Sequence, residues 1–67
     1  SSAHITRILQ KEGFFYISQR GSHAKFRKVV RGKTYTVIVP ANKREIPFGT
    51  FRSIARQSGL QAEDFEE

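Results

Sequence analysis

The chain has no cysteine, methionine or tryptophan, and it has only two prolines and six acidic residues among its 67 residues. Without cysteine, neither disulfides nor thiolate metal sites can supplement a core. A chain of this length buries only about 60% of the surface that it exposes when unfolded. We therefore expect one small domain over residues 1–67, without a deep, enclosed catalytic pocket.

Long apolar runs are also missing from the sequence. No segment approaches the roughly 20 apolar residues that span a bilayer, and the N-terminal residues lack the continuous apolar stretch of a secretory signal. We expect a soluble, cytoplasmic protein with no membrane partner. The two histidines are far apart and match no spacing of metal ligands, so we expect neither a metal nor a cofactor.

Positive charge is abundant and unevenly distributed. Twelve Lys and Arg residues give a net charge of +6, and four of the six acidic residues lie in the last five positions. The rest of the chain is strongly basic, which favours a polyanionic partner, most commonly a nucleic acid. The alternative is that the charge serves solubility alone.

Two helices are expected, one near each end of the chain. Ile5, Ile8 and Leu9 follow helical spacing and predict a helix over about residues 3–12. In the segment TFRSIARQSGL, apolar residues again recur at helical spacing, with Thr50 as the predicted N-cap and Gly59 as the stop. We expect the tail QAEDFEE to add one more turn that Phe65 holds against the body.

Three strands are expected between the helices. The runs FFYIS, AKFRKVV and TYTVIV are rich in aromatic and β-branched residues and are separated by QRGS and RGK, which contain turn-forming glycines. The order α-β-β-β-α predicts an α+β fold, a two-layer sandwich of an antiparallel three-stranded sheet with two helices on one face. The other face of the sheet stays open to water.

Side chains on that open face are the candidates for function. Strand alternation places Ala24 and Phe26 toward the core and His23, Lys25 and Arg27 on the opposite face. An imidazole can change its charge near neutral pH and can act as a general base. A surface histidine without a role is the open alternative for His23.

The surroundings of His23 favour a site for phosphate. Gly21 and Ser22 precede it and set the backbone geometry of the turn that supports the site. Further residues expected to bind RNA are Lys28, Lys43, Arg44 and Arg52. Tyr16 and Tyr35 could stack on unpaired bases, or could pack within the sheet.

Several motifs together resemble the HicA toxins of bacterial toxin–antitoxin systems. They are GSHAKF at residues 21–26, VPANKREIP at residues 39–47, GTFRSIARQSGL at residues 49–60, and the closing Glu-Asp-Phe. The resemblance extends from the first helix through Phe65. It implies a fold like that of a double-stranded-RNA-binding domain and a metal-independent endoribonuclease, an mRNA interferase that inhibits translation, with His23 as its catalytic histidine. It also implies a HicB-type antitoxin that covers the active site.

One position departs from the family pattern. Many HicA toxins carry a histidine after the proline that closes the third strand, where this chain has Ala41 and Asn42. A mechanism with two histidines is therefore not expected. Two other functions remain open from the sequence, namely a double-stranded RNA-binding module without catalysis and a basic ribosome-associated protein.

Overall fold

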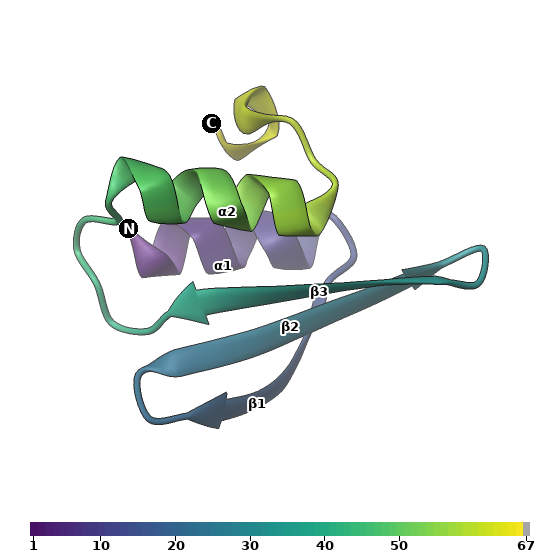
Figure 1. Cartoon of the computed structure of the whole chain (residues 1–67), viewed down its shortest axis with the longest axis horizontal. Coiled ribbons are helices and arrows are strands. Elements are labelled where there is room, and N and C mark those ends of the chain that lie inside the picture. Colours follow the sequence, from purple (N-terminus) through teal and green to yellow (C-terminus); the bar gives the residue numbers. More distant parts are fainter. Residues whose placement is uncertain (67) are drawn as a thin grey trace.

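The computed structural model describes residues 1–66. Its elements are α1 (Ser2–Lys11), β1 (Phe15–Arg20), β2 (His23–Val30), β3 (Lys33–Pro40), α2 (Phe48–Ser58) and the short 3-10 helix η1 (Ala62–Phe65). Figure 1 shows the two α-helices together on one side of the molecule, with the β2–β3 hairpin extending past them. The predicted α+β fold with α-β-β-β-α order is confirmed.

Helix α1 begins one residue earlier than predicted because Ser1 caps it. The Ser1 hydroxyl accepts a hydrogen bond from the His4 amide at 3.2 Å, which satisfies one of the amides that a helix start leaves unpaired. His4 is half-buried. Its ring lies against the Phe65 carbonyl and the Arg7 guanidinium, and it thereby connects α1 to η1.

The sheet is antiparallel with the strand order β1-β2-β3, as the meander predicts. β2 pairs with β3 along its whole length, from His23 opposite Pro40 to Val30 opposite Lys33. β1 is an edge strand, and all of its residues are exposed. The helices therefore cover the sheet unevenly, since α1 and α2 pack mainly over β3.

The core lies between the helices and the inner face of β2 and β3. Its buried side chains are Ile5, Ile8, Leu9, Phe14, Ala24, Phe26, Val37, Val39, Ile54 and Phe65. Phe26 is only 3% exposed, as the strand alternation predicts. Phe65 packs edge-to-face on Phe51, with 5.3 Å between ring centroids, which confirms that the tail is held against the body.

Helix α2 starts two residues before the predicted N-cap. Pro47 occupies the cap position and Thr50 lies within the first turn, so the prediction for Thr50 is wrong. Proline favours the extended backbone that a cap residue needs, and the Pro47 carbonyl accepts the first helical bond, from the Phe51 amide at 2.9 Å. Gly59 ends the helix with φ +74°, as expected for a left-handed cap. No helix within residues 1–66 is long and apolar enough to cross a membrane.

Candidate functional site

His23 begins β2 directly after a two-residue turn formed by Gly21 and Ser22. Gly21 has φ +58°, which glycine adopts without steric cost, so the turn reverses the chain within two residues. Two hydrogen bonds fix this turn. The Gln19 side-chain amide donates to the Gly21 carbonyl at 3.0 Å, and the Ala41 amide donates to the Ser22 carbonyl at 2.7 Å.

The side of the sheet that carries His23 is called the open face here, because it lies opposite the buried Ala24 and Phe26. Directly paired residues of antiparallel strands share a face. The register therefore places these side chains on the open face: Phe15, Ser18 and Arg20 from β1; His23, Lys25, Arg27 and Val29 from β2; Thr34, Thr36, Ile38 and Pro40 from β3. His23, Lys25 and Arg27 thus lie together, as strand alternation predicts.

Arg20 is an additional cation beside His23 that the pattern of the sequence does not predict. The β1–β2 register shifts between Tyr16 and Ser18, so that Ile17 is an extra residue in β1. Uninterrupted alternation from Tyr16, which contacts Phe26, would have put Arg20 on the helix side. The bulge reverses this assignment and sets Arg20 directly opposite His23.

Arg27 is the open-face cation that has a buried donor atom without a hydrogen bond. The residue is half-buried, and its Nε is inaccessible to solvent and has no hydrogen-bond partner among residues 1–66. A buried donor left unsatisfied costs about 1–3 kcal/mol. An external ligand cannot reach the buried Nε, but the residue is only half-buried and lies on the open face, so its positive charge is suited to attract a phosphate.

Lys28 lies on the other side of the sheet from His23. Its ammonium donates to the Glu12 carbonyl at 2.6 Å, and it lies 5.7 Å from the centroid of the Phe14 ring. The side chain therefore binds the C-terminal end of α1. The structure does not bring Lys28 to the open face.

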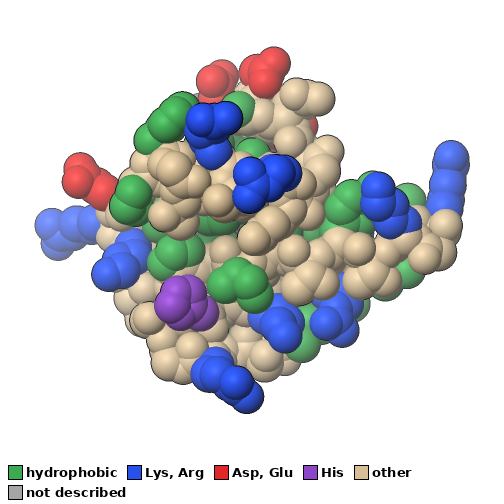
Figure 2. Space-filling view, viewed as in Figure 1, with side chains coloured by type: hydrophobic (Ala, Val, Ile, Leu, Met, Phe, Trp, Pro, Cys, Tyr) green, Lys and Arg blue, Asp and Glu red, His purple; other side chains and the backbone are tan. Residues whose placement is uncertain are grey.

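The remaining predicted cations lie beyond the open face. Lys43 and Arg44 are exposed in the loop between β3 and α2, and they line a groove on the helix side. Arg52 is exposed on α2, with its guanidinium 6.0 Å from the centroid of the Phe48 ring. In Figure 2 a histidine side chain lies among Lys and Arg side chains, while the acidic side chains lie at the upper and left margins.

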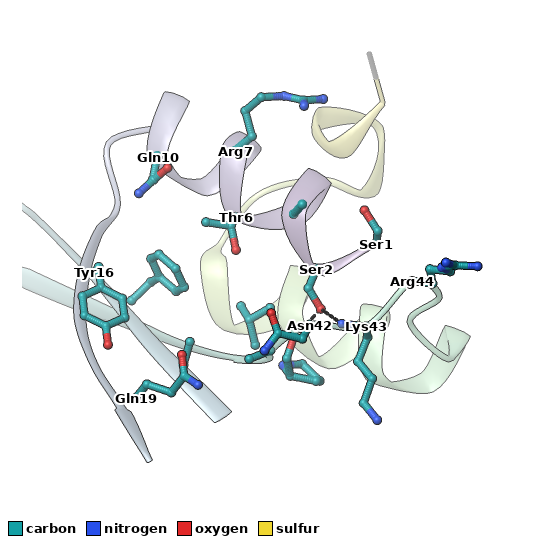
Figure 3. A pocket seen from close by; sticks show the side chains of 16 residues that line it. Ser1, Ser2, Thr6, Arg7, Gln10, Tyr16, Gln19, Asn42, Lys43 and Arg44 are labelled. Atoms are coloured by element: carbon teal, nitrogen blue, oxygen red, sulfur yellow. Dashed lines mark hydrogen bonds between the residues drawn. The ribbon is translucent and has the colours of Figure 1, made fainter. Parts of the chain in front are cut away.

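The groove with Lys43 and Arg44 runs between α1 and the uncovered helix side of β1 (Figure 3). His23 does not line it, although the adjacent Ala24 and the paired Pro40 do. The catalytic candidate and this groove therefore lie on different sides of the same sheet end. Within residues 1–66, no three His, Asp or Glu side chains lie close enough together to hold a metal ion.

Comparison with known protein families identifies the family of this chain. No curated protein sequence matches the chain significantly. The family model described as HicA toxin of bacterial toxin–antitoxin systems matches residues 2–60, which include all three strands, both α-helices and every predicted site residue. Since the match covers most of the 67 residues, the chain belongs to the HicA toxin family, and an antitoxin is the partner that this membership implies.

Proposed function

We propose that this toxin is a metal-independent endoribonuclease that cleaves mRNA, with His23 as its catalytic residue. The observation that carries the proposal is that an exposed histidine shares one open sheet face with Arg20, Lys25 and Arg27 in a member of a toxin family. The histidine supplies a proton acceptor, and the cations supply binding for a phosphate. The RNA backbone carries both a 2′-hydroxyl, whose proton the histidine can accept, and a phosphate, which the cations can bind.

The chemistry requires two proton transfers. Neutral His23 abstracts the proton of a ribose 2′-hydroxyl, and the resulting alkoxide attacks the adjacent phosphorus. The bond to the 5′-oxygen then breaks, which leaves a 2′,3′-cyclic phosphate and a 5′-hydroxyl. The leaving oxygen takes its proton from water or from the protonated His23, because no second histidine lies near the site in residues 1–66.

The cations act on the charge that develops at phosphorus. Lys25 and Arg27 follow His23 along β2 at alternate positions, so they share its face and can contact phosphates next to the reacting one. Donors that are in place before the reaction stabilise a developing negative charge most effectively. Lys25 and Arg27, both half-buried on β2, are such donors.

The proposed partner that controls this activity is an acidic antitoxin of the HicB type that covers the open face. A stable interface of standard size buries about 800 Å² on each partner. That is roughly a sixth of the 4742 Å² of accessible surface of this chain, enough to occlude His23 and its neighbouring cations. Charge complementarity would speed the encounter.

The decisive experiment compares cleavage of single-stranded RNA by the wild-type protein and by His23→Ala, in the presence of EDTA. We expect the wild type to cut and His23→Ala to bind RNA with similar affinity but not to cut. An all-deoxy substrate should resist both proteins because it has no 2′-hydroxyl. If both proteins bind RNA and neither cuts, the chain is an RNA-binding module without catalysis.

A further inference from the structure

The groove between α1 and β1 exists because the two helices leave the edge strand uncovered. It has a volume of about 810 Å³, which lies within the range of small-molecule sites. Its floor includes the buried side chains of Ala24, Phe26 and Val39. An apolar floor with polar groups around it is the usual composition of a site for a flat, partly polar ligand.

Tyr16 forms one wall of this groove and keeps its ring accessible. The residue is 53% exposed, and its ring meets Phe26 edge-to-face with 5.9 Å between centroids. Tyr35, the other tyrosine, instead packs beside Gly59 and carries the Lys33 ammonium 5.0 Å from its ring centroid. Tyr16 is therefore the tyrosine that can stack on an unpaired base.

Amide and hydroxyl side chains surround the ring. Figure 3 shows Gln19 beside Tyr16 on the strand side, and Thr6 and Gln10 on the helix side. The bond from Gln19 to the Gly21 carbonyl uses one amide hydrogen and leaves its oxygen available as an acceptor. Amides both donate and accept hydrogen bonds, as the edges of nucleobases do.

The charges at the groove favour a ligand with several negative charges, such as a nucleic acid. Lys43 and Arg44 are exposed at one end of it, and no Asp or Glu among residues 1–66 lines it. Arg7 also contributes to the lining, but its guanidinium lies 3.1 Å from His4 Nδ1 and points away from Tyr16 in Figure 3.

The groove is connected to the open face around the end of the sheet. Ala24, the neighbour of His23 in β2, lines the groove. Pro40, which pairs with His23 and so shares the open face with it, lines the groove as well. The Ala41 to Ser22 hydrogen bond holds the two turns at this end together. A nucleic-acid strand that crosses this end can place its backbone at His23 and turn a base into the groove.

We propose that the groove binds one unstacked nucleobase of single-stranded RNA, next to the phosphate at His23, with Tyr16 as the stacking platform. This inference rests on the proposed ribonuclease function. It also identifies the substrate class, because only a base released from pairing and stacking can enter the groove. Stacking of one base on an aromatic ring contributes about 1–3 kcal/mol, so its loss weakens binding about 5- to 150-fold.

The test measures the affinity of a short single-stranded RNA for four proteins, all carrying His23→Ala so that the RNA stays intact. They are the parent, Tyr16→Ala, Tyr16→Phe and Val30→Ala. Val30 is the control that should bind RNA like the parent, because it is an exposed apolar residue of the sheet that lies neither on the open face nor along the groove. We expect at least a fivefold loss for Tyr16→Ala and affinity near that of the parent for Tyr16→Phe.

A second arm scans an abasic site along the same RNA. At one position the abasic site should reduce the affinity of the parent and leave the affinity of Tyr16→Ala unchanged. The affinity for duplex RNA should be the same with and without Tyr16. Equal RNA affinities of the parent and Tyr16→Ala would overturn the proposal, as would a Tyr16→Ala effect confined to antitoxin binding. If Tyr16→Ala weakens RNA binding but the wild type never cuts RNA, the base-binding groove is supported and the proposed ribonuclease function is overturned.

Discussion

Arg27 and Lys28 are adjacent cations that have different surroundings. Arg27 faces away from the helices with an unpartnered Nε, whereas Lys28 donates to the carbonyl of Glu12 at the end of α1. The composition of the chain does not distinguish these two residues, but strand alternation places their side chains on opposite faces of the sheet. The first is suited to bind an external anion, and the second stabilises the fold.

Substitution of these two residues should therefore give reciprocal effects. We expect Arg27→Gln to weaken RNA binding severalfold with little change in the free energy of unfolding, because it removes a phosphate contact and no internal bond. Lys28→Met should lower the free energy of unfolding by about 1 kcal/mol and leave RNA affinity nearly unchanged. Fluorescence anisotropy with labelled RNA and urea denaturation measure the two quantities. A larger loss of RNA affinity for Lys28→Met than for Arg27→Gln would contradict this assignment.

At the scale of the elements, the edge strand β1 has the greatest influence on the site. Its bulge at Ile17 brings Arg20 to His23, and its uncovered helix side leaves room for the groove at Tyr16. The sequence predicts the strand itself, because FFYIS is aromatic and β-branched. It does not predict the bulge, because the insertion of one residue depends on how β1 pairs with β2.

The end of α2 provides a test of packing between a helix and the sheet. A Cβ added at Gly59 would lie 2.7 Å from Tyr35 Cε2, and φ +74° disfavours any other residue there. We expect Gly59→Ala to lower the free energy of unfolding by about 2 kcal/mol. Gly49→Ala is the matched control, because nothing lies within 4 Å of its added Cβ and it lies inside the helix.

Thermal unfolding followed by circular dichroism compares these two variants. Gly49→Ala should match or exceed the stability of the wild type, since alanine favours a helix over glycine by up to about 1 kcal/mol. Equal melting temperatures for Gly59→Ala and Gly49→Ala would show that Tyr35 does not pack against Gly59 as the structure describes.

At the scale of the whole molecule, positive charge extends over both sides of one sheet end. Arg20, Lys25 and Arg27 lie on the open face, and Lys43 and Arg44 lie beside the groove. The acidic Glu63 and Asp64 lie in η1, which packs on α1. RNA can therefore approach the open face and the groove without crossing that acidic segment.

Binding of single-stranded RNA should then depend strongly on salt. Each contacted phosphate contributes about −0.7 to the slope of log K against log salt, so five cations predict a slope of up to about −3.5. Titrations over a series of KCl concentrations measure this slope, and Arg27→Gln should make it shallower by about 0.7. A slope near zero would mean that these cations do not contact phosphates.

The sequence by itself determined the element order, the core face of β2 and the position of His23 beside Lys25 and Arg27, because these depend on local periodicity and on turn-forming glycines. The family resemblance at residues 21–26 and 49–60 was also present in the sequence, and the family model confirms it. Only the tertiary structure decided the partners of Arg20, Lys28 and His4, the start of α2 at Pro47, and the groove beside Tyr16. Each of these depends on contacts between segments far apart in the chain or on strand register, which one-dimensional spacing does not encode.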